Sequence, residues 1–296
     1  MRVLVTGASG FVGRRAVTAL LAAGAEVIAV ARRRLDIDCC WRSVDLLDAA
    51  ETRGMVRSTQ PDAVLHLAWC VEHGRFWTDP ANADWVAATL VLAQAAAEAG
   101  ARRFTGVGTC YEYDWPSRTD CHERDTPLAS HSPYDIAKTN CRSELDALFA
   151  DQGVGFAWAR LFFLYGPGED PRRLVASIAR AVTRGEIARC SRGLPVRDFM
   201  DVRDAGRALA AVSLSRTTGA VNVASGQGVR IADVALALGR LAGHPELIHL
   251  GSLPDRDHEP ERIVADIARL RDEVGFSPEF DLETGLTSAL DFWKPR

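Results

Sequence analysis

The sequence has no apolar run long enough to cross a bilayer, no signal peptide, no low-complexity tract and no internal repeat. A transmembrane helix needs roughly 20 consecutive apolar residues, so we do not expect a membrane protein. The net charge of −4 gives no general attraction to nucleic acid or to acidic lipid. With no leader before the first apolar run, we expect the protein to be cytoplasmic.

The seven cysteines are odd in number and include no Cys-x-x-Cys pair. Structural zinc sites and disulfide frameworks usually show paired cysteines. We therefore expect reduced thiols and no metal site. The length of 296 residues, with 47% hydrophobic and 25% charged residues, is typical of a soluble globular protein with a large core, in one domain or two.

The first motif is a β-branched run that breaks into three glycines and continues as an Ala- and Leu-rich segment, which predicts a strand, a tight turn and a helix. Gly7 allows the sharp turn, Gly10 removes a side chain that would block a pyrophosphate, and Gly13 lets the helix pack close to the strand. The helix N-terminus then favours an anion. We expect this turn to bind a dinucleotide, and a purely structural turn is the alternative. The expected contacts are Gly7, Ser9, Gly10, Phe11, Val12 and Gly13.

A second apolar strand is predicted over residues 26–31, and three arginines follow it directly. An acidic residue at this place holds the ribose hydroxyls of NAD, whereas arginine suits the 2′-phosphate of NADP. We therefore expect NADP as the cofactor and NAD as the less favoured one. Arg32 is the first candidate for the phosphate ligand and Arg33 the second, and a solvated basic loop is the alternative.

The glycine turn matches Thr-Gly-x-x-Gly-Phe-x-Gly, and the chain resembles the extended short-chain dehydrogenase/reductase family over nearly its whole length. The resemblance implies an α/β fold with a Rossmann-type doubly wound parallel sheet and a smaller C-terminal α/β substrate domain. We expect residues 1–164 and the returning segment 198–224 to form the NADP-binding domain. Residues 165–197 and 225–296 would form the substrate-binding domain.

The same resemblance implies further cofactor contacts at the ends of predicted strands, namely Asp45, Leu46, Leu67, Ala68, Trp69, Leu161 and Phe162. Asp45 belongs to the family's Asp-Leu segment beside the adenine, and it could equally cap the helix that follows. Trp69 replaces the last alanine of the family's His-Leu-Ala-Ala. His66, on the same strand, is expected to be a core histidine without a chemical role.

The chemistry is expected at the end of the strand predicted over residues 103–109. Thr109 lies four residues before a tyrosine, as the family's hydroxyl residue does, and Tyr134 and Lys138 form a Tyr-x-x-x-Lys pair. A ketone that receives hydride must also gain a proton, and a tyrosine near its ordinary pKa of about 10 is a poor partner for that step. Lys138, one helical turn away, would lower this pKa and hold the nicotinamide ribose, while Thr109 would hold the substrate oxygen. A coincidental surface pair is the alternative.

Dehydration is disfavoured by the residues that follow the threonine. Sugar-nucleotide 4,6-dehydratases of the family place an Asp-Glu pair there, as the acid and base that remove water. In this chain the two positions hold Cys110 and Tyr111, and Glu112 lies one position further along.

The expected substrate contacts are Thr109, Tyr111, Phe163, Arg173, Arg197 and Arg256. Phe163 stands where the family commonly has asparagine. Arginines suit a diphosphate, and most of those in the chain could equally be solvated. For Arg197 the alternative is a structural ion pair.

A largely apolar helix is predicted over residues 84–99. In the family the equivalent helix packs with the helix of the catalytic tyrosine in the four-helix bundle of a dimer. We therefore expect a homodimer.

These observations favour an NADPH-dependent reductase that acts on the keto group of a nucleotide-linked 4-keto-6-deoxyhexose, as in deoxysugar biosynthesis. The first alternative is a nucleotide-sugar epimerase that retains NAD. A reductase of a non-sugar ketone and a cofactor-sensing binding protein are further alternatives. The nucleotide-diphosphate sugar is the expected partner, with neither nucleic acid nor membrane.

Overall fold

The computed structural model describes residues 1–115, 119–129 and 131–295. Its strands are β1 (Arg2–Thr6), β2 (Glu26–Val30), β3 (Cys40–Arg42), β4 (Ala63–His66), β5 (Arg103–Thr109), β6 (Gly155–Leu161), β7 (Phe163–Tyr165), β8 (Ala188–Arg189), β9 (Val196–Asp201), β10 (Gly219–Val223), β11 (Gly228–Arg230), β12 (Ile248–His249) and β13 (Arg262–Ile263). Its α-helices are α1 (Phe11–Ala22), α2 (Ala49–Thr59), α3 (Ala81–Glu98), α4 (Pro133–Phe149), α5 (Leu174–Thr183), α6 (Val202–Leu214), α7 (Ile231–Ala242) and α8 (Leu282–Trp293). Short helical turns are η1 (Cys110–Glu112), η2 (Pro245–Leu247) and η3 (Arg269–Glu273).

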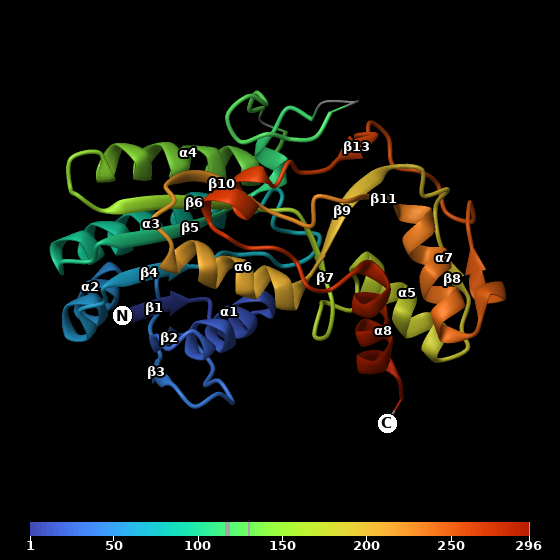
Figure 1. The fold of residues 1–296 in the computed structure, drawn as a ribbon, viewed down its shortest axis with the longest axis horizontal. Coiled ribbons are helices and arrows are strands. Elements are labelled where there is room, and N and C mark those ends of the chain that lie inside the picture. The colour runs from blue at the N-terminus through green and yellow to red at the C-terminus, as the bar shows by residue number, and fades with distance from the viewer. Residues whose placement is uncertain (116–118, 130, 296) are drawn as a thin grey trace.

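A seven-stranded parallel sheet in the order β10-β6-β5-β4-β1-β2-β3 forms the larger layer. Helices α1 and α6 cover one face of this sheet, and α2, α3 and α4 cover the other (Figure 1). Alternate residues of one strand serve the two cores: Val3 and Val5 pack with the first pair of helices, and Leu4 packs with the other three. Because both faces of its central strands are buried, most of the residues in these strands are apolar. The expected doubly wound parallel sheet is therefore confirmed.

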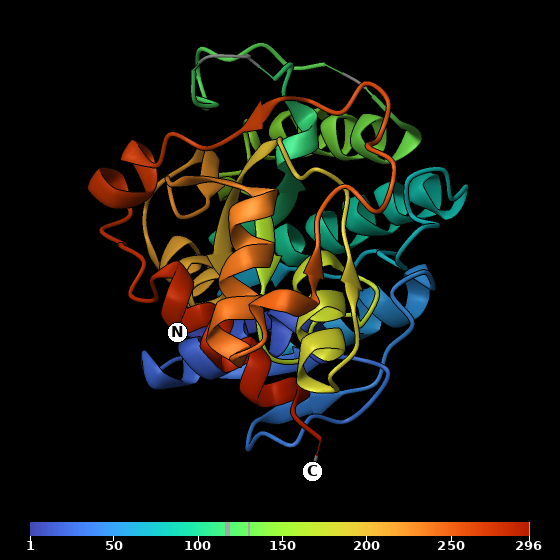
Figure 2. The same cartoon turned by 90° about the vertical axis from the view of Figure 1, so that its right-hand side faces the viewer.

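A second, smaller sheet is built around β9, which pairs with β11, β13 and β7. Helices α5, α7 and α8 share a core with this part of the chain, and Figure 2 shows these three helices facing the viewer. A two-stranded sheet of β8 and β12 completes it. The exact limits of the two domains stay a prediction. No helix of the described residues is long and apolar enough to cross a membrane.

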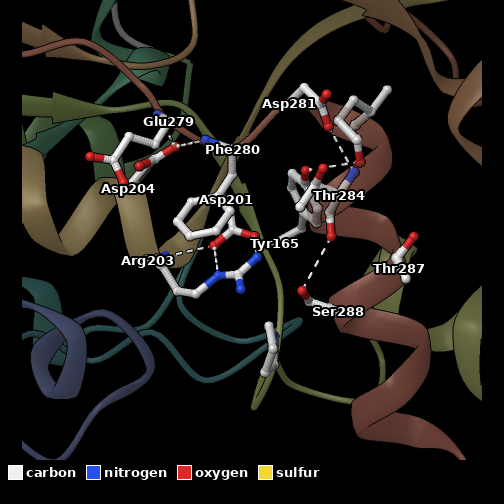
Figure 3. A network of polar contacts seen from close by, with 12 residues as sticks. Tyr165, Asp201, Arg203, Asp204, Glu279, Phe280, Asp281, Thr284, Thr287 and Ser288 are labelled. Atoms are coloured by element: carbon white, nitrogen blue, oxygen red, sulfur yellow. Dashed lines mark hydrogen bonds and ion pairs between the residues drawn. The ribbon is translucent and has the colours of Figure 1, made fainter.

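A polar network joins the start of α6 to the segment that enters α8 (Figure 3). Asp201 caps α6 by accepting from the backbone N–H of Arg203 at 2.8 Å, and it forms an ion pair with the same side chain. Asp204 accepts from the backbone N–H groups of Glu279 and Phe280 at 3.0 and 2.9 Å. The Arg203 guanidinium lies 3.7 Å from the centre of the Phe280 ring. Asp201 and Asp204, at the start of α6, thus anchor the segment that leads into α8.

We predict that Asp204→Ala lowers the free energy of unfolding by about 2 to 3 kcal/mol, because two backbone N–H groups lose their acceptor in the interior. Urea unfolding followed by circular dichroism measures this change. Asp233→Ala is the matched control, because Asp233 also lies in the first turn of a helix and pairs with an arginine, but on the surface. Equal losses in the two variants would contradict the role given to Asp204.

Candidate active site

The glycine turn has the shape that the sequence predicts. Gly7 has a φ of +65°, and a Cβ at this residue would lie 2.8 Å from the backbone nitrogen of Ala68. A Cβ at Gly13 would collide with the carbonyl oxygen of Gly7. Gly10 is exposed and starts α1 without a side-chain cap, so the first amides of the helix face outward. This cradle fits a pyrophosphate, and Ser9, Phe11 and Val12 are partly exposed around it.

The ends of β1 and β4 are joined through Thr6 and His66. The Thr6 hydroxyl oxygen accepts from the N–H groups of Leu67 and Ala68, both at 3.2 Å, and lies 2.7 Å from Nδ1 of His66. His66 Nε2 lies 2.9 Å from the Thr89 hydroxyl, which donates to the backbone. Burial lowers the pKa of His66 to about 3, so the ring is neutral. We assign the proton to Nε2, and His66 is the core histidine that we expected.

The end of β2 carries exposed arginines. Arg32 and Arg33 are both exposed, and no ion pair to either is found within the described ranges.

The alternative role of Asp45 as a helix cap is wrong. Asp48 caps α2 by accepting from the N–H groups of the first turn, because α2 begins at Ala49, and Asp45 accepts from Leu47 instead. Leu46 is buried next to it.

Tyr134 and Lys138 lie in the first two turns of α4, which Ser132 and Asp135 cap. The Tyr134 N–H donates to the carbonyl of Trp77 at 3.1 Å. The Lys138 ammonium donates to the carbonyl of Val107, on β5, at 2.9 Å. The pair therefore lies inside the protein rather than on its surface, with residue exposures of 8% and 5%.

The pKa shifts of this pair differ from our expectation. Burial, followed by the charge of Glu112, raises the pKa of Tyr134, and the charge of Arg173 acts in the opposite direction. Burial lowers the pKa of Lys138 to about 7. The expectation that Lys138 lowers the pKa of the phenol is not met in this structure, because the phenol is buried and the ammonium donates to Val107. Tyr134 therefore keeps its proton well above neutral pH.

Glu112 is the residue whose role the sequence did not indicate. Its carboxylate accepts from the backbone N–H of Thr109 at 2.9 Å and from the Trp158 indole at 2.9 Å. It also forms an ion pair with Arg160 at 2.8 Å, and both side chains are fully buried. Thr109 accepts in turn from the N–H of Tyr111, at 3.3 Å. Glu112 is thus occupied in holding η1 against β6 and is not free to act as an acid or base.

Aromatic side chains surround the tyrosine. The rings of Phe76 and Trp77 contact Tyr134 edge-on at centroid distances of 4.8 and 5.8 Å, and Trp77 also contacts Tyr111 at 4.7 Å. Phe163 lies 6.2 Å from Tyr111, so these two expected substrate residues are neighbours. Trp115 and His131 stack at 3.8 Å beside the same group. The sequence signal for this aromatic group was the high content of tryptophan and phenylalanine in residues 69–85.

The three expected arginines gather near the same place. The charges of Arg197 and Arg256 both act on the pKa of Tyr111, which burial raises. Arg197 is buried and forms an ion pair with Glu259 at 3.0 Å, which is the structural alternative stated above. Arg173 pairs with Glu169 at 3.3 Å, and Arg256 is exposed. Their contact with a substrate stays a prediction.

The expected cofactor residues lie along the carboxyl edge of the large sheet. Leu67 and Ala68 follow β4, and Leu161 ends β6, followed by the buried Phe162. Trp69 is 9% exposed and lies under the Lys138 ammonium. In doubly wound sheets this edge is where ligands bind.

Comparison with known proteins identifies a matching family model and relatives that cover nearly the whole chain. Residues 3–224 match the family model described as the NAD dependent epimerase/dehydratase family. GDP-6-deoxy-D-mannose reductase of Pseudomonas aeruginosa is 30% identical, over 100% of this chain and 98% of that protein. UDP-glucose 4-epimerase of Mycolicibacterium smegmatis is 26% identical, over 99% of both proteins. The crystal structure of Thermus thermophilus UDP-glucose 4-epimerase in complex with NAD has a TM-score of 0.87 at 26% identity and covers 99% of both chains. The similarities thus span both sheets and the whole candidate site.

We predict that Glu112→Ala costs about 3 to 5 kcal/mol of stability, because it leaves the buried Arg160 guanidinium without its counter-ion. Urea unfolding measures the loss. The double variant Glu112→Leu with Arg160→Met removes both charges and should recover much of it. A double variant that loses as much as the sum of the two single variants would contradict the buried pair as the cause.

Proposed function

This chain belongs to the NAD dependent epimerase/dehydratase family, and on that premise we propose that it reduces the keto group of a nucleotide-linked 4-keto-6-deoxyhexose with NADPH. The chain is an NAD(P)-dependent enzyme of the extended short-chain dehydrogenase/reductase type. One observation carries the proposal. Cys110 and Tyr111 stand where a dehydratase has its acid and base, and Glu112 is held by Arg160, so Tyr134 is left as the proton donor.

The residues of the chain divide the work of the reduction. When bound, a nicotinamide would supply the hydride. Tyr134, whose pKa burial raises, is present as the protonated phenol and gives its proton to the ketone oxygen. The hydroxyl of Thr109, at the end of β5, holds that oxygen, and the Lys138 ammonium supplies positive charge as the phenol loses its proton. The glycine turn would hold the pyrophosphate of the dinucleotide, and Arg173, Arg197 and Arg256 are the candidates for the diphosphate of the substrate.

The choice of NADPH rests on Arg32 and Arg33. Both are exposed at the carboxyl end of β2, where the adenosine ribose of a dinucleotide lies in Rossmann folds. Guanidinium groups at this place favour a 2′-phosphate. This observation separates the reductase from the second candidate, an epimerase with resident NAD.

The epimerase remains the second candidate because the Mycolicibacterium smegmatis and Thermus thermophilus relatives are UDP-glucose 4-epimerases. A reductase of a non-sugar ketone would use the same triad. The aromatic side chains of Trp77, Tyr111 and Phe163 suit an apolar ligand, whereas the nearby arginines favour the diphosphate. A cofactor-sensing binding protein would not need Tyr134 and Lys138, and both are buried at the site.

We also propose a homodimer formed by α3 and α4. Leu90 and Val91 of α3 and Leu148 of α4 line a groove of about 370 Å³ on the face away from the sheet. The fully buried residues of these helices, such as Leu92 and Leu145, pack against the large sheet. The partly exposed apolar side chains of the groove would be covered by the same helices of a second copy.

We predict that Tyr134→Phe abolishes nearly all turnover, because the ring is kept and the proton is lost. Its affinity for NADPH, measured by fluorescence titration, should stay near the wild-type value. Reduction of a synthetic nucleotide-linked 4-keto-6-deoxyhexose, followed at 340 nm, is the activity assay. Full activity in this variant would exclude the mechanism.

We predict that the purified protein releases little nicotinamide on denaturation and that the stripped protein binds NADPH more tightly than NADH. Arg32→Ala should weaken NADPH about 10- to 100-fold, because a charge-assisted contact to the 2′-phosphate is lost, and leave NADH unchanged. Arg34→Ala, in the same exposed loop, is the control. Release of stoichiometric NAD would instead favour the epimerase.

A further inference from the structure

The chain has 35 Lys and Arg residues, and only Lys138 and Lys294 are lysines. Lys294 lies on the surface and pairs with Asp291. Lys138 is 5% exposed. A buried ammonium loses the strong hydration that it has in water, so it needs other groups to stay charged.

Trp69 provides the nearest aromatic ring. The Lys138 Nζ lies 3.5 Å from the centre of the Trp69 ring, whereas the rings of Tyr134 and Trp158 are 5.9 Å away. A cation above an indole face is attracted by the ring's quadrupole, whose face is negative, and most strongly where water is excluded. The Trp69 ring and the carbonyl of Val107 therefore both contact and stabilise the ammonium.

The orientation of Trp69 is set by contacts other than Lys138. Its indole N–H donates to the side-chain oxygen of Asn82 at 2.8 Å, and its ring stacks on Trp85 at a centroid distance of 6.4 Å. Asn82 in turn donates to backbone carbonyls of the loop that precedes α3. The orientation of the Trp69 ring therefore does not depend on the lysine side chain.

We propose that Trp69 is a positioning residue for Lys138: its indole face holds the ammonium as a cation at a fixed place beside Tyr134. The effect of Trp69 on the charge of Lys138 does not depend on which reaction the protein catalyses, whereas its effect on turnover rests on the proposed function. An alanine at position 69 would leave the ammonium without this ring.

The other titratable groups around Lys138 do not replace the ring. On α4, Tyr134 is protonated, and burial raises the pKa of Cys141 to about 11. His66, on β4, is neutral because burial lowers its pKa to about 3. Glu112, on η1, favours the ammonium from its pair with Arg160.

The test measures the charge state of Lys138 directly. Protein made with ¹³C-lysine gives two side-chain signals, and Lys294→Arg removes one and assigns the other. The Cε shift followed against pH gives the pKa of Lys138. In Trp69→Leu the proton affinity should fall about tenfold, a drop of about 1 in this pKa. Trp69→Phe keeps an aromatic face and should restore most of it. Trp293→Leu removes a ring that lies 5.3 Å from Arg180 and is the matched control.

A second measurement covers the case in which Trp69→Leu does not fold. 5-Fluorotryptophan in place of all seven tryptophans weakens the negative face of the rings and leaves their shape nearly unchanged. The pKa of Lys138 should then fall in the wild-type chain and clearly less in Trp69→Phe, where the nearest remaining indole, Trp158, is 5.9 Å away. An unchanged pKa in both experiments overturns the proposal, as does an equal fall in the Leu and Phe variants.

The activity readout is the pH profile of kcat/KM. If charged Lys138 is required, activity is lost as the pH rises through its pKa, so the alkaline limb should move to lower pH in Trp69→Leu and return in Trp69→Phe. A shifted pKa with an unmoved alkaline limb would support Trp69 as the positioning residue and contradict the catalytic role given to Lys138.

Discussion

The candidate site depends on one buried ion pair, between Glu112 and Arg160. The carboxylate is satisfied by a backbone N–H of β5, an indole of β6 and a guanidinium of β6, so it fixes η1 relative to both strands. A Cβ at Gly108 would collide with this carboxylate, which explains why the strand has glycine there. Thr109 is held by this arrangement, and the same charge acts to raise the pKa values of both Tyr134 and Lys138. The ion pair therefore shapes both the geometry and the electrostatics of the site.

A second constraint is the close approach of β1 and β4. The glycine turn passes so near the residues after β4 that Gly7 can carry no side chain, and Thr6 satisfies the N–H groups of Leu67 and Ala68. The neutral His66 continues this chain of hydrogen bonds to α3. Two strand ends that both line the expected cofactor site are thereby fastened together. The strand ends below the expected cofactor cradle are therefore held by paired polar groups, whereas the first amides of α1 stay open for the pyrophosphate.

The sequence predicted what depends on local spacing. The glycine turn and the position of Tyr134 and Lys138 on one helix follow from residues close together in the chain, whereas the doubly wound parallel sheet was implied by the resemblance to the family. The role of Glu112 could not be predicted, because its partners lie 46 and 48 residues away. The alternative role of Asp45 as a helix cap is wrong because α2 begins only after Asp48, and both acidic residues precede the same apolar pattern. Trp77 was missed because its contact with Tyr134 is made by a loop without periodicity.

The interior placement of Lys138 has a cost that argues for a role beyond packing. Its pKa falls from 10.5 to about 7, so between these values the unfolded chain binds more protons than the folded one. Stability therefore rises with pH across this window, and the full cost of the buried ammonium is present below about pH 7. In a chain that uses arginine for nearly every cation, a lysine kept at such a position is better explained by its compact, titratable charge. Trp69, in the segment after β4, and Glu112, on η1, both favour its charged form. The fold thus offsets part of the cost at the one place where the proposed chemistry needs a cation.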